Sequence, residues 1–189
     1  MKVEITNKVN GVDVTRLQET IAAVKASPDL GRFIFRIDNQ WIDGGANRSH
    51  VQEFFGTGRT LSHKRCFLLA ADEPDVLLSG DTGANPVEHL LHALVSCVTT
   101  SMVYHAAARG IEIEQVESSL EGDLDLRGFM NLDPAVRNGY RHLRLKMRIK
   151  ANVSDEQLKE LGNLGPMFSP VYDTLLKGVP ITVAAERLS

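Results

Sequence analysis

The sequence predicts an α+β protein in which two blocks of strands are separated by one long helix. Residues 33–71 alternate between apolar and polar side chains, which is typical of strands. Residues 85–110 read as a single helix, and strand-like alternation returns at residues 111–121 and 140–150. Strands grouped in blocks around a dominant helix indicate antiparallel sheets and not alternating βα units.

Composition favours an ordinary globular protein: 43% of the 189 residues are hydrophobic and 24% are charged. We expect an N-terminal helical extension at residues 1–31 and a main domain at residues 32–189. The net charge of −3 and the absence of a long basic run argue against nucleic-acid binding. The N-terminus has no apolar signal-peptide core, and two cysteines are too few for a secreted disulfide scaffold, so we expect a reducing, cytoplasmic setting.

In the first half of the chain, residues 13–26 predict an amphipathic helix, because Leu17, Ile21 and Val24 recur at helical spacing after a possible cap at Asp13 or Thr15. Strands are expected after it, with turn residues "GGAN" after the first. Their expected ranges are 33–43, 49–56 and 65–71. The segment "DEPDVLLSGDTGAN" reads as a loop leading to the long helix.

The ends of the long helix carry clear signals. Asn85 suits the N-cap, Pro86 the first helical position, and Glu88 can reach back to the cap or face the positive helix end. Gly110 suits a left-handed C-terminal cap, with Arg109 in the last turn.

The stretch between Glu88 and Arg109 has no Asp, Glu, Lys or Arg, and it is long enough to cross a membrane. It is nevertheless too polar for lipid on all sides, so we expect a helix buried inside protein and no membrane association. A second subunit is a plausible partner, because few other helices are predicted. The polar residues are His89, His92, Ser96, Thr99, Thr100, Ser101 and His105.

The second half of the chain predicts strands at 111–121 and 140–150, with an irregular connection between them. Ser154 and Gln157 suit a capping box at the start of a short helix over residues 154–162. Another short helix is expected from about Pro170, and "PITVAAERL" predicts a final strand.

Cys97 lies in the middle of the long helix. A free cysteine most often packs as a small buried hydrophobe, and this reading stays open here. A reactive thiol would need a lowered pKa. Cys97 is too far from the N-terminal end of the helix for the helix dipole to lower it. Activation would therefore have to come from an Arg, Lys or His on another segment or another chain.

The pattern "SGDTGANPVEHLLHALVSC", with Cys97 eleven residues after Pro86, resembles the OsmC/Ohr family of osmotically inducible and organic hydroperoxide resistance proteins. The segment "FSPVYDTLLKGVPITVAAE" continues the likeness, which covers roughly residues 33–187. The resemblance implies an intertwined homodimer with long central helices between sheets and sites at the dimer interface. It also implies reduction of organic hydroperoxides or hydrogen peroxide by two cysteines, the first of which is Cys97. An Arg stabilises the first thiolate in this family, and a Glu positions that Arg.

This chain departs from the family pattern at the second cysteine, because Ser169 stands there. A sulfenic acid at Cys97 could be resolved by an external thiol, or Cys66 could substitute. The third reading is that the protein is no peroxidase and binds a hydrophobic small molecule at the dimer interface.

The remaining site residues follow from the same resemblance. Glu88 is the family acid at NPxE, although it could serve only the helix start. Arg48 lies nearest to the family arginine position, with Arg36 and Arg59 as alternatives. No cofactor is implied, and His89 and His92 at i, i+3 lack a third ligand, so we expect no metal site.

Overall fold

The computed structural model describes residues 7–188, which form two compact units. The first unit ends at His92 and the second begins at Ala93, so the division falls inside the long helix. The first unit contains β1 (Lys8–Val9), β2 (Val12–Asp13), α1 (Val14–Ala26), η1 (Pro28–Gly31), β3 (Ile34–Phe35), β4 (Asp38–Asp43), β5 (Ala46–Gly56), β6 (Arg59–Ala71) and η2 (Asp75–Leu77).

The predicted N-terminal helix is confirmed as α1. Asp13 is its N-cap, since the Asp13 carboxylate accepts a hydrogen bond from the Arg16 backbone N–H at 3.0 Å. The short β1–β2 hairpin before it was not predicted, because two-residue strands are too short to show an alternating pattern.

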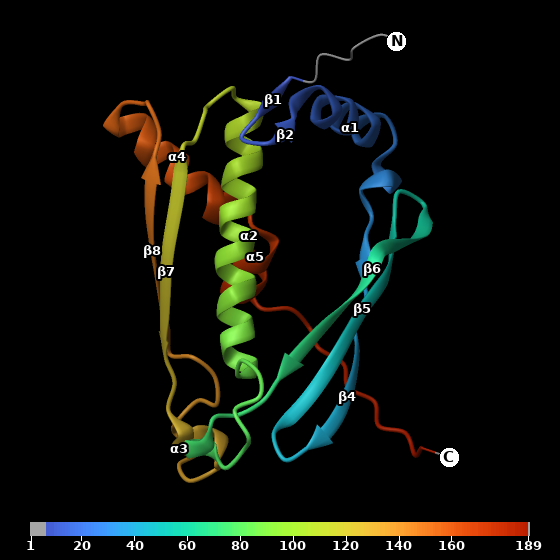
Figure 1. Cartoon of the computed structure of the whole chain (residues 1–189), viewed down its shortest axis with the longest axis vertical. Helices are drawn as coiled ribbons and strands as arrows, with labels where there is room; N and C mark the ends of the chain where they lie inside the picture. Colours follow the sequence, from blue (N-terminus) through green and yellow to red (C-terminus); the bar gives the residue numbers. More distant parts are fainter. Residues whose placement is uncertain (1–6, 189) are drawn as a thin grey trace. The chain divides into compact units, whose positions relative to one another are not determined.

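The sheet of the first unit is built on β5, which pairs antiparallel with β6 along one edge and with β3 and β4 along the other (Figure 1). Thr57 and Gly58, at φ of 51° and 78°, make the tight turn between β5 and β6. Both strands are longer than predicted, and the expected strand at 33–43 is divided into β3 and β4.

This sheet unit has no apolar core of its own. Among the described residues up to His92, only Gly56 and Asp72 are buried. Large apolar side chains on the sheet are exposed, including Phe35 at 73% and Trp41 at 68%. An apolar sheet face of this kind requires a cover from outside the unit.

The long helix α2 (Pro86–Ala108) confirms the prediction at both ends. Asn85 caps the start, where its side-chain oxygen accepts from the Val87 N–H at 2.8 Å. Gly110 follows the helix in the left-handed conformation, with φ of 69°. By length and composition α2 could also cross a membrane, a test that core helices of soluble proteins pass as well.

The second unit carries β7 (Gln115–Asp123), α3 (Leu126–Phe129), β8 (His142–Lys150), α4 (Asp155–Phe168) and α5 (Pro170–Lys177). β7 and β8 form an antiparallel hairpin, drawn side by side in Figure 1. The core of this unit is Met102 and Ala106 of α2 with Leu161 and Leu164 of α4.

Two sequence-based boundaries and one expected strand in this unit were wrong. β7 starts at Gln115 and not at residue 111, because Ile111 and Ile113 pack on the core as the chain leaves α2. α4 begins at the predicted Ser154–Gln157 capping box but continues to Phe168, beyond the expected end at residue 162. Residues 179–188 form no strand, and the apolar Ile181 and Val183 are more than 80% exposed. An alternating segment becomes a strand only when a neighbouring strand supplies hydrogen bonds.

Candidate functional site

Cys97 lies at the centre of α2 as a half-buried free thiol. The next residue, Val98, is fully buried where α4 crosses α2. The crossing is close because Gly165 has no side chain: a Cβ there would lie 2.8 Å from the Val98 carbonyl oxygen. Cys97 therefore lies beside the contact between two helices, not in the hydrocarbon core.

One stripe of α2 continues from Cys97 through Ser101 to His105, at the i, i+4 spacing of one helix face. The Ser101 hydroxyl donates to the Phe168 carbonyl oxygen at 3.3 Å. The His105 ring stacks on the Phe168 ring with 3.7 Å between centroids. The corner between α4 and α5 thus lies against this stripe, about 6 Å along the helix from Cys97.

Ser169 forms that corner and is buried, with 2% of its surface exposed. Its hydroxyl oxygen accepts from the Tyr172 backbone N–H at 3.1 Å, so Ser169 is the N-cap of α5. The position that the resemblance assigns to a second thiol therefore belongs to the same unit as Cys97, and its oxygen serves as a helix cap.

Glu88 serves the start of α2. Its Oε2 accepts from the Asn85 backbone N–H at 2.9 Å, which completes a reciprocal cap with the Asn85 side chain. The structural role, which the sequence predicts as an alternative to positioning an arginine, is thus present. The second carboxylate oxygen makes no hydrogen bond within residues 7–188.

Arg48 lies on β5, opposite Gln40 of β4 and Ala70 of β6. Its side chain is exposed and makes no ion pair or hydrogen bond with the described residues. Arg48 and Glu88 both belong to the first unit, whereas Cys97 and Ser169 belong to the second. Arg36 and Arg59, the alternatives to Arg48, are exposed as well.

Cys66 is exposed on β6, where its sulfur lies 4.0 Å from His50 Nδ1. His89 Nε2 lies 2.9 Å from the Ala70 carbonyl oxygen. No group of three or more His, Cys, Asp or Glu side chains within residues 7–188 is arranged to hold a metal ion.

The contact between His105 and Phe168 was not predicted from the sequence. Half-burial of the imidazole, and secondarily the positive charge of Arg109, lower the pKa of His105 below 6.5. The neutral ring therefore prevails at pH 7. The i, i+4 spacing from Ser101 to His105 was visible in the sequence, but its partner lies 63 residues further on.

Comparison with known proteins agrees with this architecture. A family model described as "OsmC-like protein" matches residues 79–184. A search of curated protein sequences finds no match.

Three solved structures illustrate the similarity. The OsmC-like protein from Mycoplasma pneumoniae is 19% identical, with a TM-score of 0.59 over 77% of this chain and 89% of that one. A putative osmotic stress induced and detoxification response protein from Psychrobacter arcticus is 13% identical, with a TM-score of 0.54 over 75% and 88%. An organic hydroperoxide resistance protein OsmC from Legionella pneumophila is 16% identical, with a TM-score of 0.50 over 75% and 90%.

The fold and the site define an α+β protein whose long central helix carries a half-buried free cysteine. The family match covers the end of the loop before that helix, the cysteine and the α4–α5 corner. The chain belongs to the OsmC-like family.

Proposed function

We propose that this protein is a thiol-dependent peroxidase that reduces organic hydroperoxides or hydrogen peroxide through Cys97 alone. The Cys97 thiolate attacks the terminal peroxide oxygen, the O–O bond breaks, and the leaving alkoxide or hydroxide takes a proton. Cys97 becomes a sulfenic acid, which an external thiol converts to a mixed disulfide with loss of water. A second thiol then releases Cys97 as a thiolate.

The observation that carries the proposal is the half-buried free thiol at the centre of α2. A sulfur in this position is shielded from bulk solvent but not enclosed in the core. The similar Legionella protein is described as an organic hydroperoxide resistance protein, which supports peroxide as the substrate class.

Resolution by an external thiol follows from Ser169, which is a helix cap and cannot form a disulfide. We propose that Cys66, an exposed thiol on β6, takes no part in this cycle. We propose that Arg48 stabilises the Cys97 thiolate from a second copy of the chain. Glu88 would orient that arginine through its unused carboxylate oxygen.

The direct test is to expose the protein to cumene hydroperoxide or hydrogen peroxide and trap sulfenic acid with a dimedone probe. Mass spectrometry should locate the adduct on Cys97 in wild type and in Cys66→Ser. Cys97→Ser is the control. No adduct on Cys97, together with no peroxide turnover with any dithiol, would refute the peroxidase.

The proposed roles of Glu88 and Arg48 in the reaction of Cys97 can be tested with variants that should fold normally. Glu88→Gln keeps a side chain that can complete the helix cap but loses the charge, so we expect normal thermal stability and slower sulfenic acid formation at Cys97. Arg48→Gln should slow the same step, while Arg59→Gln should not. Equal rates in all variants would remove both residues from the site.

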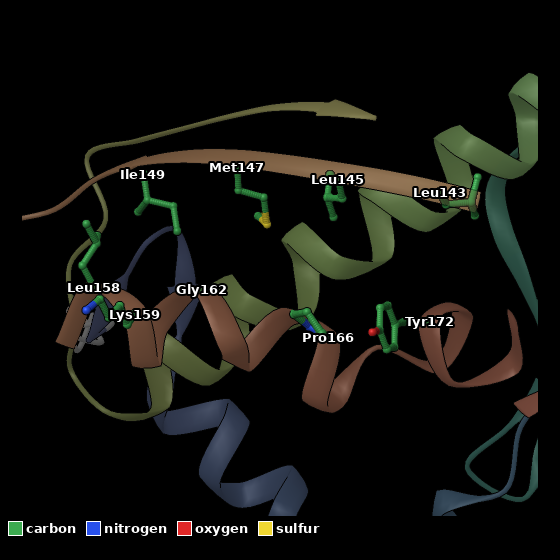
Figure 2. Close-up of a pocket in the computed structure, with 9 residues that line it drawn as sticks. All are labelled: Leu143, Leu145, Met147, Ile149, Leu158, Lys159, Gly162, Pro166 and Tyr172. Carbon is green, nitrogen blue, oxygen red and sulfur yellow. The ribbon is translucent and has the colours of Figure 1, made fainter. Parts of the chain in front are cut away.

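A second candidate function is binding of a hydrophobic small molecule, favoured by a groove in the second unit. The groove has a volume of about 550 Å³. Figure 2 shows the apolar side chains of β8 that line the groove opposite α4 and α5, which are Leu143, Leu145, Met147 and Ile149. Lys159 and Tyr172 add polar groups to the lining. Native mass spectrometry of the purified protein should reveal a bound molecule if this function holds.

We propose that the active form is a cytoplasmic homodimer. The exposed apolar sheet of the first unit needs a cover, and a second copy of the chain can provide one. A cytoplasmic setting supplies the reducing thiols that a single-cysteine cycle consumes.

A further inference from the structure

Asp72 is the one charged side chain within residues 7–188 that is buried, with 1% of its surface exposed. It begins the loop that joins β6 to α2. The peroxidase steps given above do not use it, and it forms no ion pair with a described residue.

The Asp72 carboxylate is surrounded by four donors from its own loop. Oδ1 accepts from the Glu73 N–H at 2.8 Å and the Ser79 hydroxyl at 2.6 Å. Oδ2 accepts from the Thr82 N–H at 2.9 Å and the Thr82 hydroxyl at 2.7 Å. These bonds, led by the Ser79 hydroxyl, hold the pKa of Asp72 far below its ordinary value.

The loop folded around Asp72 is tied to the sheet. The Ser79 hydroxyl oxygen also accepts from the Gly45 N–H at 3.0 Å, at the turn between β4 and β5. The Asp72 N–H donates to the Ala84 carbonyl oxygen at 3.3 Å. Gly83 packs directly on β6, where a Cβ would lie 2.9 Å from the Ala70 carbonyl oxygen.

The same loop holds the first turn of α2. The Asn85 side-chain amide donates to the Glu73 carboxylate, so the cap residue is anchored next to Asp72. The Asn85 backbone N–H donates to Glu88 Oε2 at 2.9 Å, and His89 contacts the Ala70 carbonyl oxygen. Asp72, Glu73, Asn85 and Glu88 thus form a continuous chain of contacts.

We propose that Asp72 is a positioning residue: its ionised carboxylate folds the 72–85 loop into the support that orients Asn85 and Glu88 at the start of the helix carrying Cys97. The link to Cys97 rests on the proposed peroxidase function, in which Glu88 orients an arginine. The positioning of Glu88 itself does not depend on that function.

No neighbouring charge accounts for the ionised state of the Asp72 carboxylate. The charged or titratable side chains of the loop, the β4–β5 turn and the start of α2 are Glu73, Asp75, Asp81, Asp43, Glu88 and His89, and β5 adds Arg48 opposite Ala70. None of them donates to the Asp72 carboxylate. Neutral donors alone therefore keep it ionised.

The test compares Asp72→Asn with Asp75→Asn, which removes an equal charge from an exposed position in the same loop. Hydrogen exchange of the full-length protein should be about tenfold or more faster in Asp72→Asn at Glu73 and Thr82, because their bonds to a charged acceptor are lost. Exchange should also be faster at Val87 and Glu88, because both amides donate to Asn85, whose support by the loop is weakened. Asp75→Asn should match wild type, as should the β7–β8 amides of Asp72→Asn. Sulfenic acid formation at Cys97 should slow in Asp72→Asn only.

A pH series separates the effect of the Asp72 charge on hydrogen exchange from the effect of its side-chain shape. A carboxylate with a lowered pKa stabilises the fold above its ordinary pKa and loses this contribution as the pH falls toward the lowered value. The exchange difference between wild type and Asp72→Asn should therefore be constant above about pH 5 and shrink below about pH 4. If Asp72→Asn does not fold, Thr82→Val removes one hydroxyl donor and should show the same pattern more weakly.

The outcomes are distinguishable. Unchanged exchange at Val87 and Glu88 overturns the positioning role whether or not Cys97 reacts with peroxide. Faster exchange with unchanged sulfenic acid formation overturns the link to Cys97. If wild type forms no sulfenic acid, the peroxidase fails while the exchange measurement still decides the role of Asp72.

Discussion

At the scale of single residues, Ser169 shows how one atom changes what a site can do. Its oxygen is buried and accepts the Tyr172 N–H at the start of α5. Oxygen is a stronger hydrogen-bond acceptor than thiol sulfur. The helix therefore gains a good cap at a position where the resemblance implies a second thiol.

We predict that Ser169→Ala lowers the free energy of unfolding by about 1 kcal/mol, because the first turn of α5 loses its cap. Urea denaturation followed by circular dichroism measures this change. Ser27→Ala is the matched control, since Ser27 precedes η1 without a side-chain cap bond. Equal losses in the two variants would argue against the capping role.

His105 predicts a pH dependence of stability. Its pKa is lowered in the folded protein, so the unfolded chain binds more protons and stability falls as the pH drops below 6.5. His105→Phe keeps a ring that can stack on Phe168 but cannot titrate. We predict a smaller loss of stability between about pH 7.5 and about pH 5.5 in this variant.

Urea denaturation at the two pH values checks the His105 prediction. His142→Gln, at an exposed position on β8, should behave as wild type. A pH dependence in His105→Phe as large as in wild type would assign the effect to another group.

At the scale of elements, the crossing of α2 and α4 decides the surroundings of Cys97. Gly165 brings the two backbones together at Val98, and Ser101 holds the Phe168 carbonyl oxygen one turn further on. A helix that contains Gly162, Gly165 and Pro166 looks unfavourable from its sequence, which is why its last turns were not predicted. Close packing on α2 outweighs these propensities.

We predict that Gly165→Ala destabilises the protein by about 1–3 kcal/mol, because its Cβ would lie 2.6 Å from Val98 Cγ1 and 2.8 Å from the Val98 carbonyl oxygen. Gly162→Ala is the control in the same helix. Its Cβ would meet only Ile149 Cδ1, at 3.9 Å, so we expect stabilisation of about 0.5–1 kcal/mol. Chemical denaturation of both variants measures the difference, and equal effects would contradict the close crossing.

At the scale of the whole molecule, the two units differ in how they bury apolar surface. The second unit has a core between α2 and α4, whereas the described part of the first unit has no buried apolar side chain. A sheet with exposed Phe33, Phe35 and Trp41 is typical of an interface between subunits.

We predict that the 20.8 kDa chain behaves in solution as a particle of twice that mass, and that its thermal midpoint rises with protein concentration. Light scattering and calorimetry over a dilution series check both. Phe35→Asp should weaken the association, while Ala22→Glu on the exposed side of α1 should not. A monomer at all concentrations would contradict the proposed dimer.

Much of the fold was predictable because its signals are local. Asp13 caps α1, Asn85 and Glu88 start α2, Gly110 ends it, and Ser154 with Gln157 starts α4, all through contacts of a few residues. The position of Cys97 within α2 followed from the same periodicity. The motif that carries Cys97 also identified the family.

The sequence alone determined the fold class, the helix starts and the family, because capping and periodicity act between residues that are close along the chain. Only the tertiary structure decided that α4 extends to Phe168, that residues 179–188 lack a partner strand, and that Ser169 and Asp72 are buried and hydrogen-bonded. These features depend on groups brought together by packing and on the backbone donors that packing leaves available. The packing contacts that decide these features form between segments that are far apart in the sequence, so no single segment reveals them.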